Sequence, residues 1–251
     1  GGRRGIELPR PGIGELDLGG FRDKMDSLGY YIVDRAFNPV WCSHAHRDLL
    51  RLKSRGKLQP AKTKITELIP GGASNSKETR KSIVEAKGFL SVDLIGDFSL
   101  ILDDLNTTST LAQNSAKLLD GRNASGVLNE KKDRLKELAV PSLAKLCYGR
   151  DAIALTLALN SHFPELKLGP PIGSKVLYIP HGGCEGEHLN CDSYQDPRRG
   201  LAMYLFLGKE WSTLNEGELR LHPFPFQPQD ISPRWNRAIF VDSRHTLSRI
   251  L

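Results

Sequence analysis

The chain has 251 residues, of which 39% are hydrophobic and 25% charged, and this is enough apolar material for one large folded domain. No run of about 18 apolar residues occurs, which argues against a membrane-spanning helix. The four cysteines are irregularly spaced and predict no disulfide framework, which favours an intracellular location, in the cytoplasm or, after removal of a transit peptide, in an organelle.

The net charge of +6 arises in one part of the chain. Residues 41–90 hold eleven Lys and Arg against four Asp and Glu. A solvated face explains such a segment most simply, and an acidic partner is the alternative. No aromatic residues are interleaved with these charges as stacking platforms, so we expect protein partners and do not favour nucleic acid.

The first half is predicted to be mainly helical, behind an N-terminal tail over residues 1–20. The spacing of Phe21, Met25 and Leu28 predicts a helix that ends at Gly29, and an aromatic and β-branched strand follows over 30–34. A second helix is predicted from about 38 to 54, and residues 70–79 have the composition of a loop.

Two further helices are predicted before residue 150. Apolar residues recur at steps of three and four and predict an amphipathic helix over 94–105, with Leu94, Ile95, Phe98, Ile101, Leu102 and Leu105 on its apolar face. Another helical stretch covers about 129–147, where Pro141 breaks or restarts it.

The character of the sequence changes after 168–174. Short strand-like runs follow in quick succession, punctuated by Pro, Gly and Asn: "KVLYIP" (175–180), "EHLNCD" (187–192), "LAMYLFLG" (201–208), "GELRLH" (217–222) and "RAIFVDS" (237–243). Such runs are typical of an antiparallel sandwich or barrel. We therefore predict an α+β fold, in which the helices support a C-terminal β-roll within one unit over residues 21–251.

Several motifs of this half occur in an order that resembles one enzyme family. The family has a Tyr-x-Pro-Gly strand, a strand ending in Tyr-Leu-Asn-x-x-Trp, a Gly-Gly-x-Leu-x-Leu/Ile strand and a Pro-x-x-x-Arg-Leu-x-Phe-x-Ser segment. Their counterparts here are "YIPHGG" (178–183), "DPRRGLAMYLFLGKEW" (196–211), "NEGELRLHPF" (215–224) and "ISPRWNRAIFVDSR" (231–244). The chain thus resembles the prolyl-4-hydroxylase branch of the Fe(II)/2-oxoglutarate dioxygenases, closest to the hypoxia-factor prolyl hydroxylases. The resemblance implies a double-stranded β-helix, or jelly-roll, with N-terminal supporting helices.

The resemblance implies an Fe(II) site of two histidines and one carboxylate, the first two ligands as His-x-Asp on one strand. Residues two apart on a strand share a face, about 6.6 Å apart, and can reach one ion. Counting back from Trp211 places Asn190 and Asp192 on this pair, whereas counting forward from Tyr178 places His188 and Asn190 there. The first alignment matches more residues without a gap and is preferred, and it removes the histidine.

The place of the second histidine is also altered. Aligning "DSR" (242–244) with the family's Asp-Ser-Arg puts Ser248 at that place, and a three-residue deletion puts His245 there instead. Serine is a poor Fe(II) ligand, whereas imidazole suits iron. An active site would use His188, Asp192 and His245, although His188 and Asp192 are about 13 Å apart on an extended strand and need a sharp turn between them.

The resemblance places Tyr178, Phe206 and Leu219 along the 2-oxoglutarate site. Phe206 stands where the family has a tyrosine whose hydroxyl helps to hold the cofactor. In the family, the base that binds the cofactor's carboxylate lies about ten residues beyond the second histidine, which is past residue 251 here, and the last strand of the roll is missing as well. Either the roll continues beyond residue 251, or something else covers the strand edge left behind. Arg249 is too close to the histidine's place to take the role of the base.

A zinc site is a further alternative. His181, Cys184, His188 and Cys191 have the residue types and compact spacing of zinc ligands. A strand over 187–192 would direct His188 and Cys191 to opposite faces, which separates the set.

Two functions follow from these patterns. The preferred one is a degenerate dioxygenase-like protein, a pseudoenzyme without a cofactor, that serves as a structural or binding subunit of a larger complex. The alternative is an active Fe(II)/2-oxoglutarate-dependent dioxygenase that hydroxylates a prolyl or other side chain of a polypeptide. No catalytic residue is assigned.

Overall fold

The computed structural model describes residues 8–69, 78–95, 137–147, 150–169, 171, 173–180 and 200–251. The helices in these ranges are η1 (Ile13–Glu15), α1 (Phe21–Leu28), α2 (Pro39–Ser54), α6 (Ala144–Cys147), α7 (Arg150–His162), η2 (Pro164–Leu166) and η3 (Thr213–Asn215). The strands are β1 (Tyr30–Val33), β2 (Gln59–Ile69), β3 (Glu78–Ile95), β4 (Ser174–Tyr178), β5 (Leu201–Phe206), β6 (Leu219–His222), β7 (Gln229–Ile231), β8 (Arg237–Asp242) and β9 (Leu247–Ile250).

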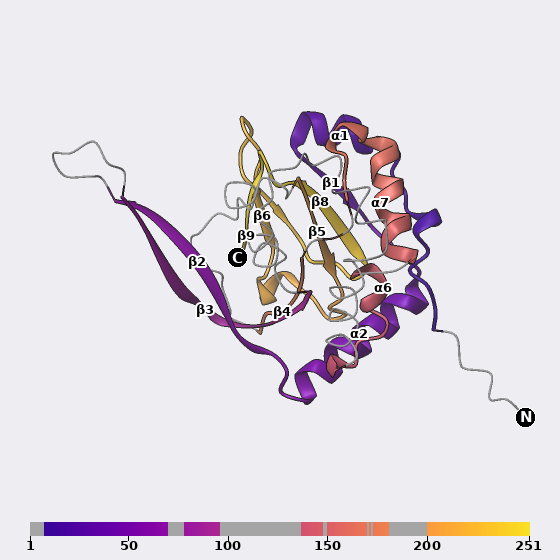
Figure 1. Cartoon of the computed structure of the whole chain (residues 1–251), viewed down its shortest axis with the longest axis horizontal. Helices are drawn as coiled ribbons and strands as arrows, with labels where there is room; N and C mark the ends of the chain where they lie inside the picture. Colours follow the sequence, from indigo (N-terminus) through magenta and orange to yellow (C-terminus); the bar gives the residue numbers. More distant parts are fainter. Residues whose placement is uncertain are drawn as a thin grey trace, which may run out of the picture.

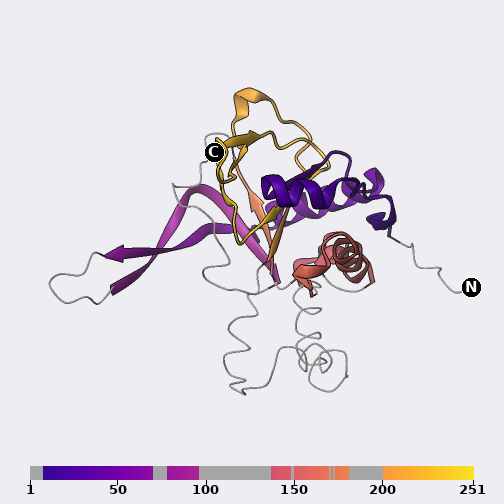
Figure 2. The same cartoon turned by 90° about the horizontal axis from the view of Figure 1, so that it is seen from above.

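The described strands form three antiparallel sheets of three strands each, in the orders β1-β8-β5, β2-β3-β4 and β7-β6-β9. Helices α1, α2 and α7 gather on one side of the β1-β8-β5 sheet, and β6 and β9 lie on its other side (Figure 1). The paired strands β2 and β3 extend away from this body in both views (Figures 1 and 2). The predicted combination of helices with an antiparallel β half is confirmed.

Local signals explain why α1 and α2 begin and end where they do. Gly29 follows α1 in the left-handed conformation, at φ 74°, and its N–H donates to the carbonyl of Met25. A Cβ at Gly29 would lie 2.1 Å from Thr246 Oγ, so only glycine fits this approach. The side chain of Asn38 accepts the N–H groups of Val40 and Trp41 at the start of α2, where Pro39 takes the first position.

Strand β8 separates two hydrophobic cores because its side chains alternate between faces. Phe240 packs with the helices in the larger core, where its ring meets that of Phe21 edge-on at 5.6 Å. Ile239 and Val241 point the other way into the smaller core, between the sheets β1-β8-β5 and β7-β6-β9. The buried members of the smaller core are Leu219, Leu221, Ile231, Ile239, Val241 and Ile250.

The N-terminal segment contributes to the larger core as well. Within the predicted tail over 1–20, Ile13, Leu16 and Leu18 are buried against this core. The boundary between a tail and a domain at residue 21 stays a prediction. No helix within the described ranges is long and apolar enough to cross a membrane.

The structure corrects some element predictions. The helix predicted over 94–105 is wrong at its start, because Leu94 and Ile95 end β3, whose residues 90–95 pair with β4. Residues 78 and 79, predicted as loop, begin β3 and pair with β2. The remaining residues of these predictions, 96–105 and 70–77, lie outside the described ranges, as do residues 129–136 of the helix predicted over 129–147. Helix α7 and the length of the β2–β3 pair were not predicted.

Candidate functional site

The candidate site is the smaller core, because two of the three residues that the resemblance places along the 2-oxoglutarate site, Phe206 and Leu219, lie there. Alternation directs Tyr204 and Phe206 of β5, Leu219 of β6 and Ser248 of β9 toward one another. Ser248 is 2% exposed, and its hydroxyl lies 2.8 Å from the hydroxyl of Tyr204. This hydrogen bond joins two strands of opposite sheets inside an otherwise aliphatic and aromatic cluster.

The three residues expected to line a cofactor do not all meet here. Phe206 packs against the smaller core and Leu219 is fully buried within it. Tyr178 packs against the larger core, and Lys53 Nζ donates to its hydroxyl at 2.6 Å and lies 4.1 Å from the ring centroid. Its neighbour Ile179 packs against the smaller core instead. The structure therefore brings Phe206 and Leu219 together with Ser248, and it directs Tyr178 toward α2.

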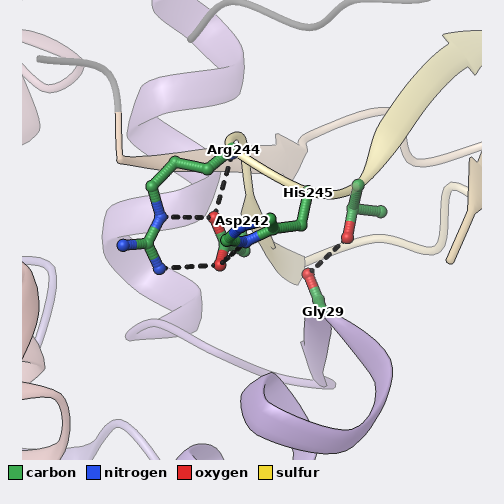
Figure 3. Close-up of polar contacts among 5 residues, drawn as sticks. Gly29, Asp242, Arg244 and His245 are labelled. Atoms are coloured by element: carbon green, nitrogen blue, oxygen red, sulfur yellow. Dashed lines mark hydrogen bonds and ion pairs between the residues drawn. The ribbon is translucent and has the colours of Figure 1, made fainter. Parts of the chain in front are cut away.

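The first predicted metal ligands, His188 and Asp192, lie outside the described ranges, together with Asn190 and with His181, Cys184 and Cys191 of the zinc alternative. His245 is described, in the turn between β8 and β9. Its Nδ1 lies 3.0 Å from Asp242 Oδ2, and its side chain is 73% exposed (Figure 3). Of the two candidates for the second histidine's place, Ser248 thus faces the smaller core and His245 lies on the turn before it.

Asp242 organises this turn. Its carboxylate accepts hydrogen bonds from Nε and Nη2 of Arg244, from the backbone N–H of Arg244, and contacts His245 (Figure 3). Burial opposes ionisation of Asp242, but the bonds from Arg244 and His245 outweigh burial and hold the pKa of this carboxyl below its usual value. Both oxygens are engaged, so the side chain holds the turn in one geometry.

The same turn is tied to the end of α1. The backbone N–H of Asp242 and the hydroxyl of Thr246 both donate to the carbonyl of Gly29, at 2.8 and 3.1 Å. A cavity of about 270 Å³ lies beside these residues and is lined by α1 and the 242–246 turn. The turn's charged groups already bind one another, so we assign this cavity no ligand.

Two solved structures are similar to this chain over most of its length. A prolyl-4-hydroxylase from Pseudomonas putida has a TM-score of 0.52 at 16% identity, over 93% of this chain and 91% of that one. A prolyl 4-hydroxylase from Phytophthora capsici has a TM-score of 0.51 at 19% identity, over 91% of this chain and 56% of that one. The chain has a prolyl-4-hydroxylase-like fold.

At these identities the likeness shows the fold alone. A prolyl hydroxylase from Trichoplax adhaerens, solved with a hypoxia inducible factor peptide, has a TM-score of only 0.46 at 15% identity, so the closer likeness to that branch stays a prediction. No protein-family model matches the chain, and no curated protein matches it in sequence.

The donor groups of a prolyl-4-hydroxylase-like fold can be compared with those in the described ranges. These ranges contain no group of three His, Cys, Asp or Glu side chains placed to hold one metal ion. The candidate ligand that faces the smaller core is the Ser248 hydroxyl, which is neutral and already bonded to Tyr204. Fe(II) prefers imidazole and carboxylate to a neutral hydroxyl, so Ser248 would be a poor ligand for it.

Tyr204 was not among the predicted site residues. Period-two alternation could have identified it, because Tyr204 and Phe206 stand two apart in "LAMYLF" and share a face. Its partner on β9 could not be found in this way, since the contact joins strands 44 residues apart.

Proposed function

We propose that this chain is a prolyl-4-hydroxylase-like protein with a degraded iron site, and that it acts as a structural or binding subunit of a larger assembly. In this proposal the sheets β1-β8-β5 and β7-β6-β9 are the described part of a double-stranded β-helix. The observation that supports the proposal most is the Tyr204–Ser248 hydrogen bond. It occupies the place where the motif alignment expects an iron-binding imidazole.

The surroundings of this bond support the same conclusion. A dicarboxylate such as 2-oxoglutarate needs cationic or hydrogen-bonding partners when it is buried. Phe206 has no hydroxyl. Alternation along β8 places Arg237 on the same face as Ile239 and Val241, but at the first residue of the strand. There the guanidinium is bound by Asp34, at 2.5 and 2.8 Å, and by the carbonyl of Ser232. The inward-facing part of the smaller core is therefore suited to packing.

A binding role is favoured by the charge distribution. The +7 excess of residues 41–90 exceeds the +6 of the whole chain, so the remaining residues are close to neutral. A chain with one strongly basic segment and a nearly neutral remainder has the charge distribution of a docking subunit.

Iron binding and 2-oxoglutarate turnover test this proposal. The purified 251-residue chain is dialysed against Fe(II) under nitrogen, its iron content is measured, and decarboxylation of labelled 2-oxoglutarate is assayed. We expect less than stoichiometric iron and no turnover above the background of free iron. Asp192→Ala and His245→Ala should leave both measurements, and the stability of the protein, nearly unchanged.

The alternative function, an active dioxygenase, predicts the opposite result. Stoichiometric iron with turnover, both lost on changing His188, Asp192 or His245 to alanine, would establish an active dioxygenase and reject the degraded site.

A further inference from the structure

Helix α2 exposes two apolar side chains among arginines. Val40 and Leu50 are 56% and 52% exposed, and the 3.6-residue period places the exposed Arg47 and Arg51 on the same side of the helix. The exposed Arg55 follows the last helical residue, Ser54, at the C-cap. The opposite side, with Trp41, Cys42, Ala45 and Leu52, is buried in the larger core. We name the exposed set of Val40, Arg47, Leu50, Arg51 and Arg55 the α2 outer face.

Within the described ranges, most of this positive charge has no neutralising ion pair. Arg47 and Arg55 have no ion-pair partner within the described ranges. Arg51 lies 3.5 Å from an oxygen of Asp48, but this carboxylate is buried and accepts the N–H groups of Ser142 and Leu143. By contrast, the nearby Lys53 and Lys57 do not belong to the face, because they bind Tyr178 and Glu137.

The helix dipole accounts for only part of the pattern. Cations in the last turn of a helix are stabilised by its carbonyl groups, which explains Arg51 and its neighbours at the C-terminal end of α2. Arg47 precedes this turn and gains little from the dipole. The dipole also gives no reason for Leu50 and Val40 to be in water, where their exposure costs apolar free energy.

We propose that the α2 outer face binds an acidic segment of a partner protein that presents two apolar residues. This deepens the proposed function, since it rests on the binding role assigned there. Val40 and Leu50 are ten residues apart, or roughly 15 Å along the helix axis, and the arginines lie between and beside them at steps of about 6 Å. A helical partner with acidic residues around two leucines matches this spacing. Duplex nucleic acid offers phosphates but no apolar groups for Val40 and Leu50, so a protein segment is favoured.

The position of α2 keeps this surface apart from the smaller core. Helix α2 lies at the bottom of the view in Figure 1, on the same side of the β1-β8-β5 sheet as α1 and α7, whereas β6 and β9 lie on the other side. Binding at the α2 outer face and binding of iron in the roll can therefore be measured independently.

The probe is a fluorescein-labelled helical peptide, rich in glutamate, with two leucines ten residues apart, and its matched control has serines in their place. Fluorescence anisotropy with the full chain at about 50 mM salt should show saturable binding of the leucine peptide, about tenfold tighter than that of the serine peptide. A 20-bp DNA duplex is titrated alongside and should bind more weakly than the leucine peptide.

Variants locate the binding. Arg47→Glu with Arg51→Glu should weaken the leucine peptide by about tenfold or more, and Leu50→Ser by about tenfold. The control, Lys24→Glu with Arg150→Glu, changes the net charge by the same amount at exposed positions outside α2 and should bind like the native chain. Thermal unfolding verifies that each variant is folded.

Three outcomes would overturn the proposal: no saturable binding of the leucine peptide, equal binding of the serine peptide, or tighter binding of the duplex that the α2 variants abolish. The last would identify a nucleic-acid surface. Stoichiometric iron with turnover, found together with peptide binding, would reject the degraded site and leave this proposal standing. If neither iron nor the peptide bound, the degraded iron site would stand and the binding role of the α2 outer face would be rejected.

Discussion

The two sides of the β1-β8-β5 sheet are built differently. On the helix side, large aromatic rings meet edge-on, with Phe21 contacting Tyr31, Phe163 and Phe240 at centroid distances of 5.3 to 6.5 Å. On the roll side, aliphatic residues enclose one polar pair, Tyr204 and Ser248. The buried residues on the first side hold the helices against the sheet, which is a structural role. In an active dioxygenase of this fold we would expect the iron and the cofactor on the second side. In this chain, the described inward-facing residues of that side pack against one another.

The comparison implies that the helix side provides most of the stability. Phe240 is fully buried there, and its neighbour Ile239 is equally buried on the roll side. Phe240→Ala should lower the free energy of unfolding by about 3–5 kcal/mol, because it opens a large cavity and removes an edge-on aromatic contact. Ile239→Ala should cost less, at the lower end of about 2–5 kcal/mol. Urea unfolding of both variants measures the order, and a larger loss for Ile239→Ala would show that the roll side is the main core.

The polar pair of the roll side should act as one unit. Tyr204→Phe and Ser248→Ala each remove the hydrogen bond between the two hydroxyls and should each cost about 1 kcal/mol in unfolding free energy. The double variant should cost less than the sum of the two, with a coupling of about 0.5–1 kcal/mol. Additive losses would mean that the pair does not hold the two sheets together, and would remove the main support for a closed interior.

Part of the fold could be predicted from the sequence because the signals are local. Gly29 and Asn38 mark the ends of α1 and α2 directly, and the alternating runs mark β4, β5, β6 and β8. Helix α7 gave no such signal, since "AIALTLAL" has apolar residues at nearly every position and fits either a strand or a helix. Only the burial of Ala152, Leu155 and Leu159 against the core distinguishes the helix.

The long β2–β3 pair and the contacts of the site depend on distant parts of the chain. Strand β3 ends beside β4, about 80 residues later, and this pairing overrides the helical spacing of Leu94 and Ile95. In the site, motif order was enough to identify Ser248 as an inward position, but not its partner Tyr204. The contact of Tyr178 with Lys53, 125 residues earlier, was also beyond local patterns.

The smallest expected effect is a change of stability with pH that arises from two buried carboxylates, Asp48 and Asp242. Their contributions to stability should depend on pH in opposite directions. Asp48 is 1% exposed on the helix side, and burial, opposed by the N–H groups of Ser142 and Leu143, raises its pKa above the usual 3.8. The native state therefore holds this proton more tightly than the unfolded chain does. Its contribution to stability is present below about pH 4 and is lost as the pH rises through the raised pKa.

Asp48→Asn removes this titration while its amide oxygen still accepts the N–H groups of Ser142 and Leu143, so the change at neutral pH should stay below about 1 kcal/mol. Between pH 3.5 and 6.5, the urea midpoint of the native protein should fall relative to that of the variant as the pH rises. Asp242→Asn is the matched control with the opposite sign: the pKa of Asp242 is lowered, so its contribution is present above about pH 4 and is lost as the pH falls. If both variants shifted in the same direction, burial would not be the dominant influence on Asp48, and the carboxylate would instead be held by charge, as it is in the 242–246 turn.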